Sequence, residues 1–200
     1  MTSRTIAVVT AGLTTPSSTR LLADRLSAAV RDQLDGRGTA YKIEVIELRD
    51  LAHDLTNNLL TGFPSADLGK VLETVIGADA LIAVTPTFSA SYNGLFKMFF
   101  DVLDDQALAG KPVLIAATGG TERHSLVLDF ALRPLFSYLK AIVMPTGVYA
   151  ASSDWGAGAT KLHARIERAA TELVDAMNNE RPAAVDPYAN PTAFEDLLNS

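Results

Sequence analysis

Short runs of apolar and β-branched residues alternate along this chain with longer segments whose apolar residues recur every three or four positions. The short runs predict strands at residues 5–10, 41–48, 80–85, 112–118 and 141–144. Several of them are nearly continuously apolar, which is typical of parallel strands covered by helices on both faces. The run at 41–48 alternates apolar with charged residues and therefore suits the edge of a sheet.

The longer segments predict helices at 18–34, 68–76, 92–103, 125–139 and 160–177. Strand and helix thus alternate five times, which predicts an α/β fold with an open, doubly wound sheet between two helical layers. A chain of 200 residues suits five parallel strands in the order 2-1-3-4-5 better than a six-stranded dinucleotide fold. Ligands of such a sheet lie at the turns after strands one and three.

We expect one domain over residues 1–178, because the composition changes after Met177. Prolines at 182, 187 and 191 argue against regular structure there. Residues 179–200 are therefore predicted to be an extended tail that contacts a neighbouring subunit.

Composition narrows the function classes. Hydrophobic residues make up 48% of the chain and the formal net charge is −6, which fits a globular protein and disfavours nucleic-acid and anionic-membrane binders. The absence of cysteine excludes disulfides, thiol catalysis and Cys-ligated metals, and no metal site is expected. The sequence shows neither a signal peptide nor 18 consecutive apolar residues, so we expect a cytoplasmic protein.

The turn after the first strand carries five hydroxyl residues within the six positions 14–19. Serine and threonine are common helix caps, so an over-supplied cap is one interpretation. A phosphate held at the helix N-terminus is the other, because hydroxyls, free N–H groups and the helix dipole favour anions there. The turn is neither a P-loop nor a three-glycine dinucleotide motif.

Two more polar turns follow strands three and four. Residues 85–95 combine a proline with hydroxyls and the aromatic rings of Phe88 and Tyr92, and residues 118–125 contain the adjacent glycines Gly119 and Gly120. Adjacent glycines permit close approach of a ligand, although a turn with positive φ explains one of them equally well. Because the carboxyl ends of parallel strands share one edge, we expect the three turns to converge on one crevice.

Together these turns resemble those of NAD(P)H-dependent FMN reductases, a family with a flavodoxin-like fold. The resemblance rests on Thr-Ala-Gly and Pro-Ser-Ser-Thr within 10–19, on Thr-Pro-x-Phe-x-Ala-Ser-Tyr-x-Gly-x-x-Lys at 85–97, and on Gly-Lys-Pro-Val-Leu-x-x-Ala-Thr-Gly-Gly-Thr-x-x-His at 110–124. The resemblance covers about residues 5–178. Within the family, the chain is most similar to the reductases that supply reduced flavin to two-component, luciferase-like monooxygenases.

The resemblance implies a hydride transfer from NADH or NADPH to FMN, without a catalytic acid or base. It also implies a flavin-dependent monooxygenase as partner, and the apolar residues at 96–103 lead us to expect a homodimer or homotetramer. Ser17 and Thr19 are expected to donate to the FMN phosphate, and Arg20 and Arg123 are candidate contacts for a nicotinamide 2′-phosphate. The implied FMN-binding residues are Gly12, Leu13, Thr14, Ser17, Ser18 and Thr19 for the phosphate, Pro86, Thr87, Phe88, Ser89, Asn93 and Gly94 for the ribityl chain and ring, and Thr118, Gly119, Gly120 and Thr121 for the polar edge of the ring.

The chain departs from the family pattern at two positions. The family's first turn often reads Gly-Ser followed by an arginine, whereas this chain has Gly12-Leu13-Thr14, so a hydroxyl and a charge are missing unless Thr14, Thr15 or Arg20 substitutes. Phe130 stands where sulfonate-linked relatives have a tyrosine, in a helix widened by one residue.

Other functions remain as alternatives. A quinone or azo reductase with bound FMN shares the fold, the flavin and the hydride donor, and a non-enzymatic flavodoxin-like electron carrier would bind FMN tightly without a nicotinamide pocket. We also expect a subunit contact on residues 96–103, because apolar side chains there cover more than half of the helix circumference.

Overall fold

A computed structural model describes residues 3–156 and 158–178. Its central sheet has the order β2-β1-β3-β5-β6, and each neighbouring pair in that order is parallel. This is the predicted 2-1-3-4-5 order of a flavodoxin-like fold. These five strands are β1 (Arg4–Thr10), β2 (Tyr41–Glu47), β3 (Ala80–Phe88), β5 (Pro112–Gly119) and β6 (Ile142–Val143).

Two further strands bring the described sheet to seven rather than five. β4 (Ser91–Tyr92) forms a short antiparallel hairpin with β3, and β7 (Val148–Ala151) continues along β5 after β6 ends. The fifth strand is thus split, because Pro145 cannot donate a ladder hydrogen bond. Glu172 satisfies the interrupted backbone there by accepting from the backbone N–H of Thr146 at 2.7 Å.

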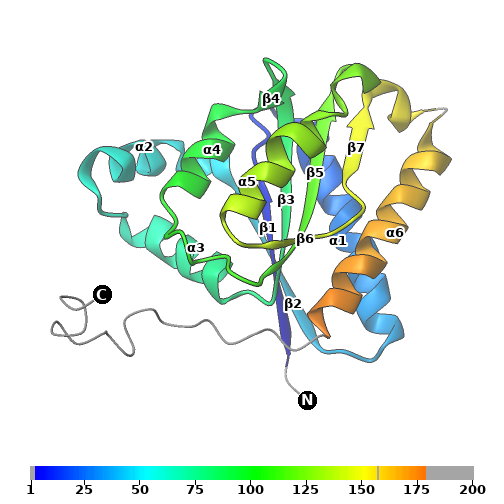
Figure 1. Cartoon of the computed structure of the whole chain (residues 1–200), viewed down its shortest axis with the longest axis horizontal. Helices are drawn as coiled ribbons and strands as arrows, with labels where there is room; N and C mark the ends of the chain where they lie inside the picture. The colour runs from blue at the N-terminus through cyan, green and yellow to red at the C-terminus, as the bar shows by residue number, and fades with distance from the viewer. Residues whose placement is uncertain (1–2, 157, 179–200) are drawn as a thin grey trace, which may run out of the picture.

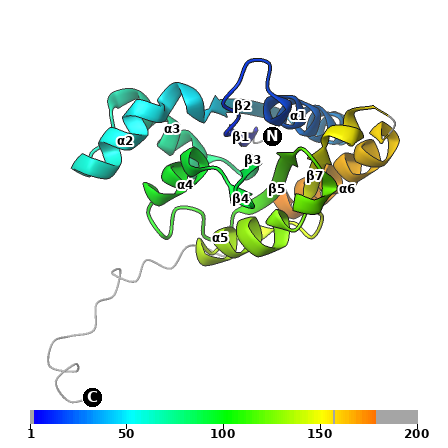
Figure 2. The ribbon, with the colours of Figure 1, turned by 90° about the horizontal axis from the view of Figure 1, so that it is seen from above.

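Helices cover both faces of this sheet, which gives three layers (Figures 1 and 2). α1 (Ser18–Gly36) and α6 (Ala159–Met177) pack on one face. The other face is covered by α2 (Ala52–Thr61), α3 (Ala66–Gly77), α4 (Gly94–Asp101) and α5 (Arg133–Tyr138).

Two helical segments differ from the prediction. The 3₁₀ turn Leu48–Leu51 and α2 were not predicted, because Asn57 and Asn58 weaken the helical pattern there. The helix predicted at 125–139 is interrupted by a π turn at Leu128–Leu132. Pro134 has no N–H to donate to the carbonyl of Phe130, so the backbone widens before α5. This is the widening that the family resemblance implies at Phe130, whose ring is 78% exposed.

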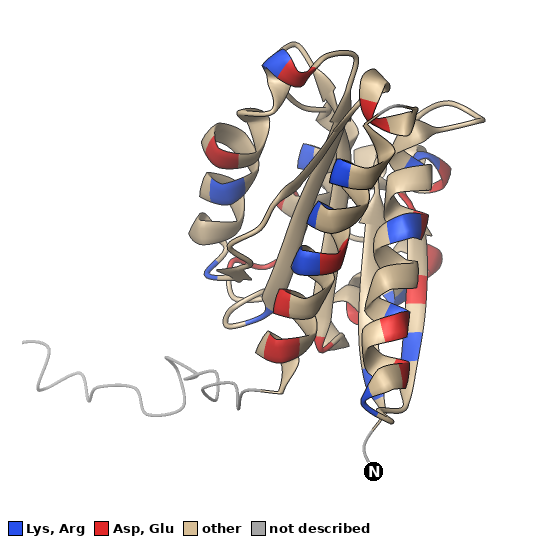
Figure 3. Cartoon of the chain, turned by 90° about the vertical axis from the view of Figure 1, so that its right-hand side faces the viewer, with Lys and Arg blue, Asp and Glu red and all other residues tan. Residues whose placement is uncertain are grey.

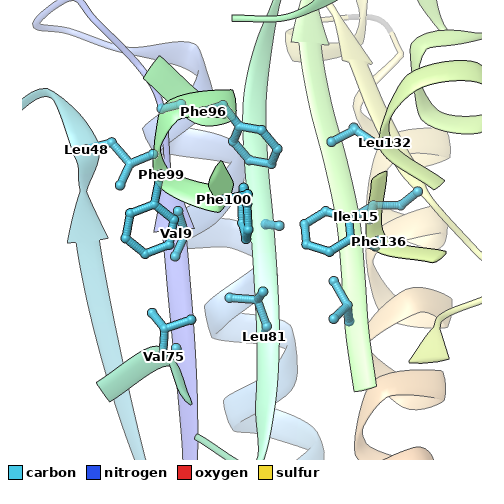
Figure 4. Close-up of a cluster of buried hydrophobic side chains, with 14 of the residues drawn as sticks. Val9, Leu48, Val75, Leu81, Phe96, Phe99, Phe100, Ile115, Leu132 and Phe136 are labelled. Atoms are coloured by element: carbon cyan, nitrogen blue, oxygen red, sulfur yellow. The ribbon is translucent and has the colours of Figure 1, made fainter. Parts of the chain in front are cut away.

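The apolar side chains of α4 belong to the core of the chain (Figure 4). Phe96, Phe99 and Phe100 are each at most 2% exposed. The rings of Phe96 and Phe100 also contact Phe136 of α5, with centroids 6.3 and 4.9 Å away. The three phenylalanines are therefore covered within the chain, whereas Met98 and Val102 are only partly buried, and the subunit contact predicted on residues 96–103 stays a prediction.

The outer surfaces of α1 and α6 carry positive and negative residues intermixed (Figure 3). Among the described residues, no helix is long and apolar enough to cross a membrane. The predicted tail contact at 179–200 lies outside the described residues.

Candidate functional site

The first turn, after β1, is organised around a helix cap. Ser17 is the N-cap of α1, and its hydroxyl accepts a hydrogen bond from the backbone N–H of Arg20 at 3.2 Å. A Cβ on Gly12 would lie 2.1 Å from this hydroxyl oxygen, so a larger residue there would displace the capping side chain. Thr14 donates to the carbonyl of Pro16 at 3.0 Å, and Leu13 is 49% exposed. Capping therefore uses Ser17, while Ser18 stands exposed beside it.

Thr19 points inward rather than toward the turn. It is 2% exposed, and its hydroxyl lies 2.9 Å from that of Thr118, which is 3% exposed. This pair joins the start of α1 to the end of β5. The Thr19 hydroxyl is engaged inside the protein, so the group that this position offers to an anion is its backbone N–H.

Asn93 joins the second turn to the first. Its side-chain amide donates to the carbonyl of Ala11 at 2.8 Å, and its side-chain oxygen accepts from the backbone N–H of Phe96 at 2.8 Å. Its own backbone N–H donates to the hydroxyl of Thr85 at 3.2 Å. Asn93 is 2% exposed, so it positions the two turns and caps α4.

The hairpin between β3 and β4 projects from the same edge of the sheet (Figure 1). Its tip, Ser89 and Ala90, has φ values of +49° and +66°, a left-handed conformation that residues other than glycine rarely adopt. Phe88 beside it is 48% exposed, whereas Pro86 is buried. A flat apolar side chain is thus presented on a strained turn.

The two glycines of the third turn have different surroundings. Neither has a positive φ, so the backbone conformation requires neither of them. A Cβ on Gly119 would lie 2.0 Å from the hydroxyl of Tyr149, whereas a Cβ on Gly120 would meet no atom within 4 Å. Protein packing explains Gly119, and the exposed Gly120 leaves open space at the edge of the sheet.

Tyr149 of β7 holds this third turn in place. Its ring is 6% exposed, and its hydroxyl donates to the carbonyl of Thr121 at 2.9 Å. Burial raises the pKa of the phenol above its ordinary value. The sequence analysis missed Tyr149 because the strand that carries it follows an apparent proline turn.

Arg49 was missed as well. It lies in the 3₁₀ turn after β2, and its guanidinium donates to the carbonyl of Thr14 at 3.3 Å and to the hydroxyl of Thr15. It also forms an ion pair with Glu47 at 2.9 Å. The signal was present in the sequence, since strand two lies next to strand one and its carboxyl end reaches the same edge.

Two cavities lie near these turns. One of about 270 Å³ lies between the first turn and the end of β2, where Thr14, Ser17, Arg20 and Arg49 contribute to its lining. The larger, of about 640 Å³, lies behind the third turn, where Glu122, Tyr149 and Arg165 are among its lining residues. Arg123, one of the two candidate arginines, is exposed and is not among the lining residues of either cavity.

Comparison with known proteins identifies relatives over most of the chain. The sequence model of the family described as NADPH-dependent FMN reductase matches residues 4–156. The chain is 43% identical over 150 residues to an FMN reductase (NADPH) of Pseudomonas aeruginosa, covering 75% of this chain and 78% of that protein. It is 37% identical over 172 residues to the NADH-dependent FMN reductase SfnE of Pseudomonas putida, covering 84% and 90%. The crystal structure of an oxidoreductase from Corynebacterium diphtheriae superposes with a TM-score of 0.86 at 49% identity, covering 89% of this chain and 98% of that one.

Proposed function

Because this chain belongs to the NADPH-dependent FMN reductase family, we propose that it transfers a hydride from a reduced nicotinamide nucleotide to FMN and releases the reduced flavin to a separate monooxygenase. FMN supplies the hydride acceptor when it is bound. The residues of the chain then have to hold and orient two ligands, and no side chain has to act as a catalytic acid or base.

The observation that carries this proposal is the open space at Gly120. Neither the backbone conformation nor the packing of the protein requires glycine at that position, whereas both other turns are tied to the third or to each other by buried hydrogen bonds. The polar edge of a flat ring can bind backbone groups only where it can approach the backbone closely. Gly120 permits this approach, because it has no side chain and open space beside it. Gly120 and Thr121 would contact this edge, and Gly119 would keep the turn close to Tyr149.

The start of α1 would hold the phosphate. The backbone N–H groups of Ser18 and Thr19 lie in the first turn of the helix, where an anion is favoured. The exposed hydroxyl of Ser18 adds a donor beside them. Gly12 to Thr14 would close over the phosphate from the strand side.

The second turn would contact the ribityl chain and the face of the ring. Pro86 and Thr87 lie near the end of β3 and next to Gly119, since a Cβ on Gly119 would lie 3.6 Å from the Cβ of Thr87. Phe88, the last residue of β3, and Ser89 at the hairpin tip follow and are exposed, and Gly94 has open space around its Cβ position. Phe88 offers one stacking surface, because the ring of Tyr92 packs on Phe96 with centroids 5.8 Å apart.

A single stacking surface favours modest affinity for FMN, because the second face of the ring then has no aromatic partner. We infer a dissociation constant on the order of 1 μM for FMN, so that the flavin acts as a diffusible substrate. The second face of the ring then stays accessible to the nicotinamide. The relatives named above are described with NADPH in one case and NADH in the other, so the proposal includes both donors.

A homodimer or homotetramer is part of the proposal. Large apolar side chains are exposed along residues 126–142, where Phe130 is 78% and Tyr138 is 76% exposed. Exposed apolar side chains that gather on one surface mark association sites, and we propose that these residues form the subunit contact. Light scattering should therefore give a mass above that of one chain, and a monomer at micromolar concentration would contradict this part.

The experiment is to pass the purified protein through a desalting column and then follow oxidation of NADH and NADPH with FMN or a quinone as acceptor. We expect colourless protein and a rate that saturates with added FMN. If stoichiometric flavin stays bound and the quinone is the better acceptor, a quinone or azo reductase replaces this proposal. If flavin stays bound without nicotinamide oxidation, an electron carrier replaces it.

A further inference from the structure

The cavity beside the first turn brings together two arginines that are far apart in the sequence. Arg20 comes from α1 and Arg49 from the turn after β2, and both line this space of about 270 Å³. The parallel pairing of β1 with β2 sets Thr10 opposite Glu47, so the two strands end at the same level. Arg49 therefore reaches the first turn from the neighbouring strand.

Glu47 holds the two guanidinium groups together. Arg20 donates to one of its carboxylate oxygens, and Arg49 forms an ion pair with the other at 2.9 Å. Glu47 is 18% exposed in its side chain, compared with 36% for Arg20 and 30% for Arg49. Two positive charges thus share one largely buried carboxylate. These three groups carry a formal charge of +1, and Asp24, which also lines the cavity and pairs with Arg20, brings the sum to zero.

The remaining carboxylates near these arginines are easily displaced. Asp24 accepts from Arg20 at 2.8 Å but is 50% exposed, and Asp50 lies 3.6 Å from Arg49 and is 73% exposed. Exposed pairs of this kind contribute little free energy. A ligand with a stronger negative charge can replace Asp24 on Arg20 at small cost.

These observations point to a phosphate monoester. Its dianion presents several acceptor oxygens, and the forked donors of arginine match that geometry. The cavity is smaller than the range of about 300–1,000 Å³ typical of whole small-molecule sites, so it suits the end of a ligand. Thr14 and Ser17 add hydroxyls to the same lining.

We propose that Arg20 and Arg49 bind a phosphate monoester in this cavity and that Arg49 supplies the positive charge missing from the first turn. The proposal rests on the function proposed above, which provides two such groups, the 5′-phosphate of FMN and the 2′-phosphate of NADPH. Both have the same chemistry, and the experiment separates them.

Binding is measured first without turnover. FMN and riboflavin are titrated by flavin fluorescence, and 2′,5′-ADP and 5′-AMP by calorimetry, against the wild type, Arg49→Gln, Asp24→Asn and the control Arg168→Gln on the exposed side of α6. Arg49→Gln should weaken binding of one phosphate-bearing ligand about tenfold, and of its partner without that phosphate less than twofold. Asp24→Asn removes a competing acceptor and should tighten the same ligand about two- to threefold.

Loss of FMN but not riboflavin binding assigns the cavity to the 5′-phosphate, and loss of 2′,5′-ADP but not 5′-AMP binding assigns it to the 2′-phosphate. Arg49→Lys should recover part of the affinity, because a point charge remains without the fork. Equal effects on both members of each pair, or no difference from Arg168→Gln, overturn the proposal. A wild type that reduces FMN while these variants bind normally refutes this inference alone, whereas a wild type that does not reduce FMN refutes the proposed function.

Discussion

Gly119 and Gly120 are adjacent, yet alanine should have opposite consequences at the two positions. A Cβ on Gly119 would lie 2.0 Å from the hydroxyl of Tyr149 and 3.1 Å from the ring carbon that carries it. A Cβ on Gly120 would enter open space on the protein side. Gly119→Ala therefore tests the packing of the turn, and Gly120→Ala tests the place that we assign to the flavin.

The expected magnitudes follow from these surroundings. Gly119→Ala forces Tyr149 to move, and overpacking of this kind costs about 1–3 kcal/mol of unfolding free energy. For a chain of this size, each kcal/mol lowers the melting temperature by about 2–4 °C. Gly120→Ala has no strained φ and no contact, so the stiffer unfolded chain should leave stability unchanged or raise it by about 0.4–1 kcal/mol.

In Gly120→Ala the affinity for FMN should fall, although the stability does not. A methyl group on Gly120 occupies the approach of the ring, and we expect FMN binding to weaken about tenfold, which corresponds to about 1.4 kcal/mol. Thermal unfolding followed by circular dichroism, together with a fluorescence titration of FMN, measures both quantities on the same samples. Tyr149→Phe combined with Gly119→Ala serves as the control, because removal of the hydroxyl relieves the shorter contact and should restore part of the stability.

Two results would refute this reasoning. Wild-type affinity of Gly120→Ala for FMN would mean that the ring does not approach this backbone. A loss of stability in Gly120→Ala equal to that in Gly119→Ala would mean that the space around Gly120 is filled in solution.

Three further predictions concern groups that hold the turns. Ser17→Ala removes the N-cap bond to Arg20 and should lower the free energy of unfolding by about 1 kcal/mol in urea titrations, whereas Ser18→Ala should change it little. Asn93→Ala leaves the carbonyl of Ala11 and the N–H of Phe96 unpaired, so it should cost about 1–3 kcal/mol for each group and weaken FMN binding, and an unchanged midpoint in urea would contradict the role of Asn93. Burial raises the pKa of Tyr149, so its contribution to stability is fully present below the ordinary tyrosine pKa of about 10 and is lost as pH rises further; Tyr149→Phe should flatten the alkaline limb of stability against pH.

The order of the sheet could be predicted because strand pattern and length leave few topologies. Four of the five predicted strands coincide closely with β1, β2, β3 and β5. The fifth was only half found, because Pro145 hides the continuation of the chain into β7. α2 was missed for a related reason, since a short helix with two asparagines is stabilised by burial of Leu55 rather than by propensity.

The positions of the three turns were also predictable from the sequence, but the contacts that their side chains make were not. Thr19 and Asn93 carry polar groups in the expected turns, yet the structure uses their side chains to join one turn to another. A hydroxyl or an amide that follows a strand offers the same pattern in sequence whether it faces a ligand or a neighbouring loop. Which of the two it does depends on the burial of the residue, and that is fixed by packing across the sheet.

The missing charge of the first turn illustrates the same point at longer range. The chain has Leu13 and Thr14 where relatives of the resembled family often place an arginine, and local reasoning looked for a substitute within the same turn. The substitute that the structure offers is Arg49, more than thirty positions away, because β2 pairs with β1 and both strands end at one edge. In a parallel sheet, a group missing from one turn can be supplied by the turn of the adjacent strand. The residues after the neighbouring strand therefore belong to the first turn as a binding surface, and substitutions at 47–50 should change ligand affinity as strongly as substitutions at 13–16.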